Sequence, residues 1–394
     1  MDRQALEYTR EHYNKHSNQY GSTQEALAAR ASGPGAPLKK FHNYIKRHLI
    51  NRFAKGAPRL LDLACGRGGD IWKWIDAGIP CVKGIDLSPH EIEEARARFS
   101  EAQARKSELS LDYSFEASPE LGLSECKESE RYDAVTCMFA VHYFFVAEKA
   151  LKQFLHNVSI NLKPGGYFFG TVPDGRRVNE CIRGSLTYQS PMLTVEARWK
   201  GSPGCFGSAY ICAIGDTVTG SEKGTEGSLE YLVYSNVFVG VAAQYGLVPV
   251  LQYDMPSLEN VLDPADANKP LKHFLPRFPG SHPSLEQASR LFATFVFQKQ
   301  GEYPAAEPGA RKQDAAEPTA RKQDAAEPAI RSDETSEASQ PHPRLHEAAA
   351  AAEPPAATLQ VQKRDRGADL APKNPADDDN PMPGLEAALK RTRR

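Results

Sequence analysis

A glycine-rich turn followed by a strand-end acid is the stretch of this sequence whose residues could carry chemistry. Glycines stand at positions 66, 68 and 69, shortly after an apolar run that ends at Leu63. Glycines let a ligand approach the backbone closely, and the helix that begins there offers free N–H groups to an anion. Asp86 ends the next apolar run, about twenty residues further on, where a carboxylate can accept hydrogen bonds from ribose hydroxyls. The pattern predicts a ligand of the nucleotide class.

A strand–turn–helix–strand unit must position these residues. Leu60–Leu63 and Cys81–Ile85 have the apolar content of buried strands, and a helix is expected from about Asp70. The connection is long enough for a right-handed βαβ unit. Residues 64–69, read as A-x-G-x-x-G, fit a dinucleotide pyrophosphate. Residues 62–70, read as D-x-x-C-G-x-G-G-D, are similar to the first motif of S-adenosylmethionine-dependent methyltransferases. A tight turn that binds nothing is a third interpretation.

The rest of the chain up to residue 300 alternates between expected strands and helices, which predicts a doubly wound, mostly parallel sheet. Residues 38–53 form a helix with one apolar and one basic face. Ser88 and Glu91 predict a capping box at the start of another helix. A long insertion at about 174–228 reads as irregular, and Glu230–Tyr245 reads as helical. The other expected elements are strands at 111–117, in the first part of 132–143, at 167–172, 247–251 and 292–297, and a helix at 147–162.

Composition limits the class of protein. The chain has 394 residues, of which 40% are hydrophobic and 25% charged, and its net charge is −2, so a general affinity for nucleic acid is not expected from the whole-chain charge. No apolar run approaches the roughly 18 residues of a membrane span. The first twenty residues are polar, which argues against a secretory signal. The seven cysteines include no C-x-x-C pair, so we expect reduced thiols and no metal site.

The last part of the chain, 301–394, changes in composition. The sequence A-A-E-P-x-A-R-K-Q-D occurs at 305–314 and again at 315–324, and proline and alanine dominate the residues after 324. Such a segment cannot bury enough apolar surface to offset its ordering entropy, so a disordered tail is predicted after a domain at 1–300. The chain ends in the basic cluster LKRTRR, which fits a nuclear-import signal, a nucleic-acid contact or a solvated terminus.

Several short stretches, in the same order and at similar spacing, resemble the eukaryotic-type mRNA cap guanine-N7 methyltransferases. The resemblance covers roughly residues 8–300 and implies a class I methyltransferase (Rossmann-like) fold. It also implies methyl transfer from S-adenosylmethionine to N7 of the terminal guanosine of capped mRNA. The stretches are HYN (12–14), FHNYIK (41–46), LDLACGRGGDIWKW (61–74), FAVHYFF (139–145), PGGYFFGTVPD (164–174) and EYLVY (230–234).

The resemblance assigns one group of residues to the cofactor. Lys46 is expected near the methionine carboxylate, and Asp86 at the ribose hydroxyls. Glu116, which replaces the usual Asp, is expected near the adenine amine. Met138 stands where the family has Gln, and a lost hydrogen bond would weaken cofactor binding by roughly 0.5–1.5 kcal/mol. The remaining cofactor positions are Ala64, Gly66 and Tyr143. Ala64 stands where the family commonly has Gly, which we expect to be a small and tolerable change. Tyr143 also matches a position that holds the guanine.

A second group is assigned to the cap. Asn43 fits an asparagine that touches the cap, and His42 replaces a second asparagine. Arg67, Lys73 and Arg98 match basic positions that face the cap phosphates. The base is expected to contact His142, Glu230 and Phe292.

The expected mechanism needs no acid–base residue, because guanine N7 carries a lone pair and no proton. The expected transfer is an in-line displacement at a sulfonium methyl, favoured by orientation and by groups that stabilise positive charge. The expected partners are capped RNA, with other capping enzymes or the RNA polymerase II machinery, and the protein is expected to be a nuclear monomer, with a viral factory as the alternative place. Two other functions stay open: a class I methyltransferase with a different substrate, and a catalytically weak cap-binding adaptor.

Overall fold

The structure, a computed structural model, describes residues 9–11, 33–215, 217, 227–278 and 283–301. The predicted tail after Gly301 lies outside the described residues, so its disorder stays a prediction. Of the first 32 residues only 9–11 are described, and they are helical.

A mostly parallel sheet forms the centre of the fold, as predicted. Its strands run in the order β3-β2-β1-β4-β5-β12-β10, and β11 pairs with β12 beside this path. The first five are parallel, whereas β12 lies antiparallel between β5 and β10. The chain order reverses between β1 and β4, where open parallel sheets bind their ligands. The strands are β1 (Arg59–Leu63), β2 (Cys81–Asp86), β3 (Asp112–Ala117), β4 (Tyr132–Met138), β5 (Leu162–Pro173), β10 (Leu247–Pro249), β11 (Leu271–His273) and β12 (Phe292–Lys299).

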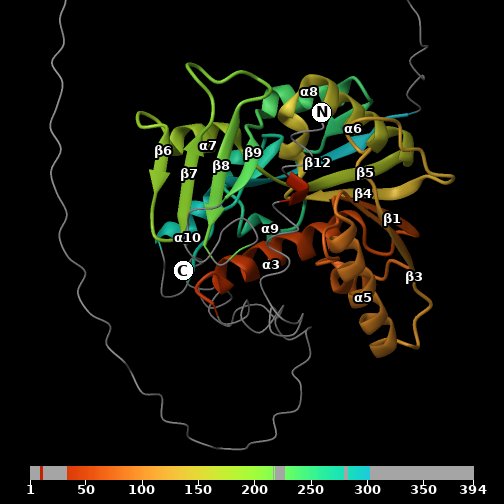
Figure 1. The fold of residues 1–394 in the computed structure, drawn as a ribbon. Coiled ribbons are helices and arrows are strands. Elements are labelled where there is room, and N and C mark those ends of the chain that lie inside the picture. The colour runs from red at the N-terminus through yellow and green to blue at the C-terminus, as the bar shows by residue number, and fades with distance from the viewer. Residues whose placement is uncertain (1–8, 12–32, 216, 218–226, 279–282, 302–394) are drawn as a thin grey trace, which may run out of the picture. The chain divides into compact units, whose positions relative to one another are not determined.

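Helices cover both faces of this sheet, which confirms the predicted class I methyltransferase fold (Figure 1). Side chains alternate along each strand, so Leu60 and Phe169 pack toward one layer and Leu61 and Phe168 toward the other. One layer contains α3 (Ala36–Phe53), α4 (Ile71–Asp76), α5 (Pro89–Arg105), α9 (Pro256–Glu259) and α10 (Pro283–Arg290), and the other contains η1 (Val141–Val146), α6 (Glu148–Asn161) and α8 (Ser235–Ala243). A short 3-10 turn, η2 (Pro264–Asp266), precedes β11.

The insertion expected to be irregular instead builds a second sheet. Strands β6 (Thr187–Gln189), β7 (Leu193–Ala197), β8 (Ala209–Ile214) and β9 (Ser228–Tyr231) pair antiparallel in chain order, after the short helix α7 (Gly175–Cys181). Alternating buried side chains such as Leu193 and Val195 support it, but glycine-rich turns hide that short pattern in the sequence. The same pairing corrects the helix expected from Glu230. This residue pairs with Tyr210 across the β8–β9 ladder, and α8 begins only at Ser235.

The start of α5 confirms half of the predicted capping box. The Ser88 hydroxyl accepts a hydrogen bond from the Glu91 N–H at 3.2 Å. The Glu91 carboxylate, however, accepts from Arg67, and the Ser88 N–H donates to Asp86 instead. The N-terminal cap of α5 therefore shares its residues with the turns that follow β1 and β2.

Within the described part of the chain, no helix has the length and apolar character of a membrane span. All seven cysteines lie in this part, and no disulfide joins any two of them. No cluster of metal-ligating side chains occurs among the described residues.

Candidate functional site

A cavity of about 320 Å³ opens at the carboxyl ends of β1, β2 and β4. This is the place where the strand order reverses, and the volume is at the lower end of small-molecule sites, roughly 300–1,000 Å³. Six of the seven residues predicted to bind the cofactor line it: Lys46, Ala64, Gly66, Asp86, Met138 and Tyr143.

The turn after β1 wraps its backbone around the cavity. Ala64, Gly66 and Gly68 have positive φ angles of 61°, 52° and 67°. At Gly68 a side chain would also clash, since a Cβ there would lie 2.6 Å from the Ile71 side chain. The glycines are thus required by conformation at 66 and by both conformation and space at 68. Ala64 adopts the left-handed conformation although it is not glycine, so the exchange predicted to be tolerable carries strain.

We expect Ala64→Gly to stabilise the protein by up to about 1 kcal/mol, because relief of the left-handed strain exceeds the added entropy of the unfolded chain. Urea unfolding midpoints measure this change. Ala97→Gly, on the exposed face of α5, is the matched control and should destabilise by about 1 kcal/mol. A lower midpoint for Ala64→Gly would contradict the expectation.

Asp86 is fixed at the end of β2 by the backbone around it. Its Oδ2 accepts from the Gly66 N–H at 2.8 Å, and its Oδ1 accepts from the Ser88 N–H at 2.9 Å. Burial raises its pKa to about 6, while these two hydrogen bonds act in the opposite direction. The carboxylate is therefore ionised at neutral pH, oriented toward the cavity that it lines, and able to accept from further donors.

A cluster of four titratable side chains is centred on Asp70 beside the turn. Lys46 contacts Asp70 at 2.7 Å, and Lys73 contacts the same carboxylate at 3.1 Å. Burial alone would raise the pKa of Asp70, but the two lysines outweigh it and hold the pKa at about 2. Burial and the charge of Asp70 raise the pKa of nearby Asp62 to about 8. Two cations and one anion remain at neutral pH, a net positive charge that suits a ligand carboxylate.

Glu116 and Lys73 are two of the predicted residues that do not line the cavity. Glu116 is absent from its lining, and its carboxylate, 55% exposed, pairs with Lys83 at 2.7 Å. Lys73 is only 2% exposed and donates to the Gly69 carbonyl at 3.0 Å besides Asp70. An ammonium turned inward in this way is a support for Asp70 rather than a contact for phosphate. The other two basic positions, Arg67 and Arg98, do line the cavity, with Arg67 paired to Glu91 at 3.0 Å.

Next to the cavity, β9 and η1 bring together the residues predicted to hold the base. Tyr143, which lines the cavity, shares a hydrogen bond of 2.8 Å with the Ser228 hydroxyl. Glu230 accepts from the Tyr210 hydroxyl at 2.7 Å, and its Oε1 lies 3.9 Å from Nε2 of His142.

The His142 and Glu230 side chains are buried in an unusual state. His142 is 2% exposed, and within the described residues neither ring nitrogen has a hydrogen-bond partner. Burial lowers its pKa to about 3, so the imidazole is neutral. Burial also raises the pKa of Glu230 to about 7, with the Tyr210 hydrogen bond acting against it. A buried polar group without a partner costs about 1–3 kcal/mol, and a ligand that supplies one would recover that cost.

An aromatic cluster forms another wall beside this place. Phe139 stacks on His42, with ring centroids 4.9 Å apart, and Phe292 meets the edge of Phe139 at 5.2 Å. His42 also shares a hydrogen bond of 3.0 Å with the Ser289 hydroxyl. His42 and Phe292 are thus together, but neither lines the cavity, and the same holds for Asn43 on α3.

Some residues of the cavity were not identified from the sequence. Phe139 lines it with a positive φ of 59°, a costly conformation for a bulky residue. The FAVHYFF stretch contained this residue, but no pattern indicated its conformation. Thr9 and Arg10 also line the cavity, and their polar surroundings gave no signal. The others are Cys65, Leu87, Ser118, Pro119, Leu121, Gly122, Ala140 and Phe144.

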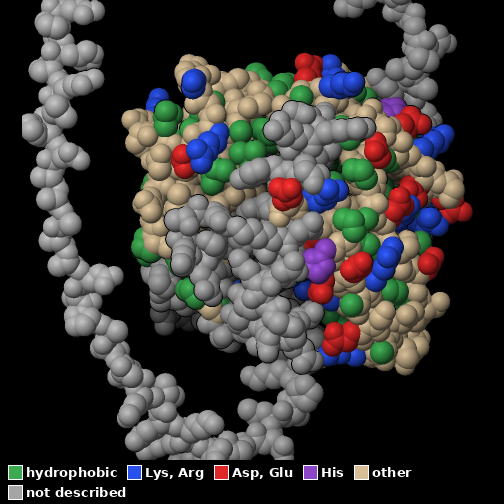
Figure 2. All heavy atoms as spheres, in the orientation of Figure 1, with side chains coloured by type: hydrophobic (Ala, Val, Ile, Leu, Met, Phe, Trp, Pro, Cys, Tyr) green, Lys and Arg blue, Asp and Glu red, His purple; other side chains and the backbone are tan. Residues whose placement is uncertain are grey.

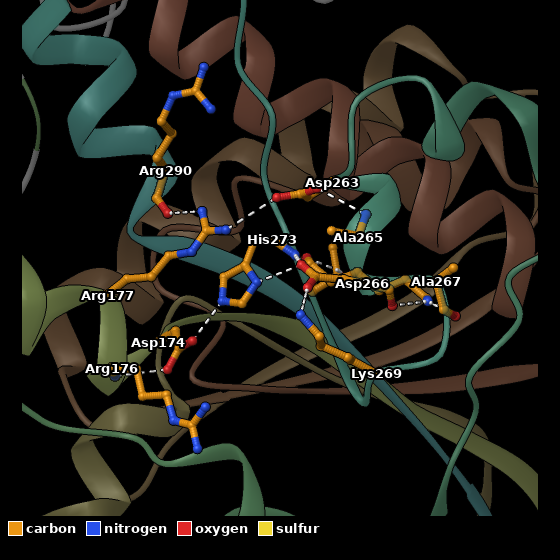
Figure 3. Close-up of polar contacts among 12 residues, drawn as sticks. Asp174, Arg176, Arg177, Asp263, Ala265, Asp266, Ala267, Lys269, His273 and Arg290 are labelled. Carbon is orange, nitrogen blue, oxygen red and sulfur yellow. Dashed lines mark hydrogen bonds and ion pairs between the residues drawn. The ribbon is translucent and has the colours of Figure 1, made fainter.

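A buried charged group is centred on His273, the residue before Phe274 (Figure 3). Its Nδ1 lies 2.6 Å from Oδ2 of Asp266, and its Nε2 lies 2.6 Å from Oδ2 of Asp174. Carboxylate oxygens only accept, so the form that satisfies both contacts is an imidazolium that donates from both nitrogens. The neighbouring Phe274 N–H donates to the Phe292 carbonyl at 2.9 Å, which ties this group to the aromatic wall.

Comparison with known proteins bears on this site as a whole. Residues 2–322 match the model of the mRNA (guanine-N(7))-methyltransferase domain. The chain is 29% identical over 328 residues to mRNA cap guanine-N(7) methyltransferase 1 of Arabidopsis thaliana, covering 77% of this chain and 84% of the plant protein. It is 28% identical over 324 residues to the mRNA cap guanine-N(7) methyltransferase of Candida glabrata, covering 75% of this chain and 73% of the yeast protein.

Proposed function

Because this chain belongs to the mRNA (guanine-N(7))-methyltransferase family, and therefore transfers a methyl group from S-adenosylmethionine to N7 of the terminal guanosine of capped mRNA, we propose a placement for both reactants. The cofactor occupies the cavity at the ends of β1, β2 and β4. The guanine lies beyond Tyr143, against His142 and Glu230.

The observation that carries this placement is the state of His142. Its buried ring nitrogens have no hydrogen-bond partner within the described part of the chain, and the nearest carboxylate oxygen, on Glu230, is 3.9 Å away. A guanine there supplies N1–H and N2–H donors to the Glu230 carboxylate. The neutral imidazole can donate to an acceptor such as guanine O6. The base thus satisfies polar groups that the protein leaves without partners.

The residues of the cavity fit an adenosyl and methionine group. Asp86 offers an ionised acceptor for the ribose hydroxyls, and the net positive cluster around Lys46 faces the carboxylate. The backbone at Ala64 and Gly66 lies against the cofactor, and Met138 and Tyr143 line the same cavity. When bound, the cofactor supplies an electrophilic methyl group.

The protein's part in the transfer is orientation and electrostatics. N7 carries no proton, so no general base is required and none is assigned. The site holds N7 in line with the methyl group, in near-attack geometry. As positive charge develops on the purine, the Glu230 carboxylate and the Tyr143 ring stabilise it.

For the cap phosphates we propose Arg67 and Arg98, which line the cavity, whereas Lys73, the third basic residue predicted for the phosphates, does not. Lys73 is reassigned to positioning Asp70, and Glu116 to its ion pair with Lys83. On the face drawn in Figure 2, acidic and basic side chains are interspersed.

The raised pKa of Glu230 predicts a pH dependence. Only the carboxylate can accept both guanine hydrogen bonds, and it is lost as the pH falls through about 7. We therefore expect kcat/KM for capped RNA to fall by about tenfold per pH unit below pH 7 and to be level above it. Glu230→Gln should have a low kcat/KM that does not fall further as the pH is lowered through 7. An acid limb near pH 7 that persists in Glu230→Gln would contradict the assignment.

The activity itself is measured with labelled S-adenosylmethionine on RNA ending in GpppN, beside uncapped triphosphate RNA. Label only on the capped RNA, at N7, agrees with the proposal. If Glu230→Gln and His142→Ala methylate capped RNA as fast as the unaltered protein, the placement of the base is wrong even though the activity stands.

We also propose a nuclear location, with other capping enzymes or the RNA polymerase II machinery as neighbours, and a monomeric state. The basic cluster LKRTRR at the chain end supports the location. Imaging of the full chain beside one with these basic residues replaced by alanine tests it.

A further inference from the structure

One wall of the cavity is a loop that has few backbone hydrogen bonds of its own. Ser118, Pro119, Leu121 and Gly122 belong to the connection between β3 and β4 and line the cavity. Buried backbone groups must find partners, and most of a loop that runs between strands lies outside the hydrogen-bonded sheet. Several of these partners are side chains of α6.

Two buried asparagines on α6 hold the loop. Asn157 donates from Nδ2 to the carbonyls of Leu121, at 3.0 Å, and Ser124, at 2.9 Å, and its Oδ1 accepts from the Cys126 N–H at 3.0 Å. Asn161, one helical turn later, donates to the Cys126 carbonyl at 2.6 Å and accepts from the Glu128 N–H at 2.8 Å. Their exposed fractions are 1% and 3%.

The loop also packs tightly where it meets the cavity. A Cβ on Gly122 would lie 2.9 Å from the Phe144 ring, which itself lines the cavity and stacks on Phe154. The Ser118 N–H donates to the Asp86 carbonyl at 2.8 Å. The position of the loop is therefore coupled to the residue proposed to bind the ribose.

The order of the strands places this wall on the adenine side. Asp86 ends β2, the loop follows β3 on one side, and Lys46 and Asp70 lie on the other side, beyond the turn after β1. An S-adenosyl amino acid with its ribose at Asp86 and its amino-acid carboxylate toward Lys46 has its adenine base against Pro119 and Leu121.

We propose that Asn157 and Asn161 are positioning residues for the adenosine part of the cofactor. Neither lines the cavity. They fix the loop from behind, and the loop determines the shape of the adenine wall. This inference depends on the cofactor and not on where the guanine binds.

Calorimetric binding of two nucleosides tests the proposal on the full chain. S-adenosylhomocysteine carries the amino-acid part, and 5′-methylthioadenosine lacks it. Asn157→Ala should raise the Kd of both by the same factor, between about tenfold and a hundredfold. Lys46→Ala should raise the Kd of S-adenosylhomocysteine and leave the Kd of 5′-methylthioadenosine unchanged. The KM for capped RNA at saturating cofactor should change less than twofold in Asn157→Ala.

Gln153→Ala is the matched control, because the Gln153 side chain donates to Asn157 at 3.3 Å rather than to the backbone of the loop. It should leave both Kd values unchanged. If Asn157→Ala fails to fold, Asn161→Ala is measured in the same way. Unchanged Kd values in a folded variant with a lowered melting temperature would overturn the proposal and leave a structural role only. If Asn157→Ala raised the KM for capped RNA by the same factor as the Kd of the two nucleosides, the proposal would also be overturned, because the variant would then disturb the whole site and not the cofactor side alone.

Discussion

Replacing Asp86 by alanine is expected to raise the Kd of S-adenosylhomocysteine by about 10²- to 10⁴-fold and to remove methyl transfer at ordinary cofactor concentrations. Two hydrogen bonds from ribose hydroxyls to an ionised acceptor are lost, each contributing about 1.5–3 kcal/mol. The Gly66 and Ser88 N–H groups also lose the acceptor that orients the turn.

Asparagine should be nearly as harmful at this position. Both carboxylate oxygens of Asp86 accept a backbone N–H, and an amide offers only one acceptor, so its NH₂ group would face a donor. Glu93→Ala, which removes an exposed acid from α5, is the charge-matched control and should bind normally. A normal Kd for Asp86→Ala in a folded protein would show that the ribose lies elsewhere.

The same carboxylate gives cofactor binding its own pH dependence. Because burial raises the pKa of Asp86 to about 6, affinity for S-adenosylhomocysteine should decline as the pH falls below 6. The loss of cofactor affinity is thus expected about one pH unit below the loss of activity expected from Glu230. Calorimetry without RNA measures the cofactor affinity separately.

Local features of the site could be predicted from the sequence because neighbouring residues determine them. The glycine turn, the Ser88 cap and the strand that ends in Asp86 each depend on a few consecutive residues. The loop between β3 and β4 shows the limit of such prediction. Its position depends on Asn157 and Asn161, which follow it by more than thirty positions and have no signature as partners.

Side-chain direction was the least predictable property. Lys46 and Lys73 both suit an anionic ligand by type, yet Lys73 lies on the first turn of α4, where it folds back on Asp70 and Gly69. Lys46 reaches the same carboxylate from α3 and still lines the cavity. Which lysine faces the ligand follows from the packing of α3 against α4 and cannot be derived from either segment alone. The backbone conformation of Glu230 is equally dependent on distant residues, because only the pairing of β9 with β8 makes Glu230 a strand residue.

The stability of the wall behind Phe292 should depend strongly on His273. We expect His273→Gln to lower the free energy of unfolding by about 3–5 kcal/mol, the usual cost of removing one partner from a buried ion pair. The Asp174 and Asp266 side chains are 7% and 2% exposed, so water cannot replace the lost cation. Burial would raise the pKa of Asp266, but hydrogen bonds from Lys269 and His273 lower it. The variant therefore leaves charged oxygens without one of their donors.

A double-mutant cycle distinguishes this charge effect from lost packing. Asp174→Asn removes one of the two carboxylates, so in the His273→Gln background it should restore part of the lost stability, whereas on its own it should destabilise. Arg177→Gln is the control, since its pair with Asp263 is longer, at 3.4 Å, and about a quarter exposed, and should cost less than about 1 kcal/mol. Urea unfolding at pH 7 measures the four proteins of the cycle and the Arg177→Gln control. Additive losses in the double variant would mean that His273 acts by packing alone. A rescue would mean that the imidazolium (Figure 3) joins α7 to β11 by its charge.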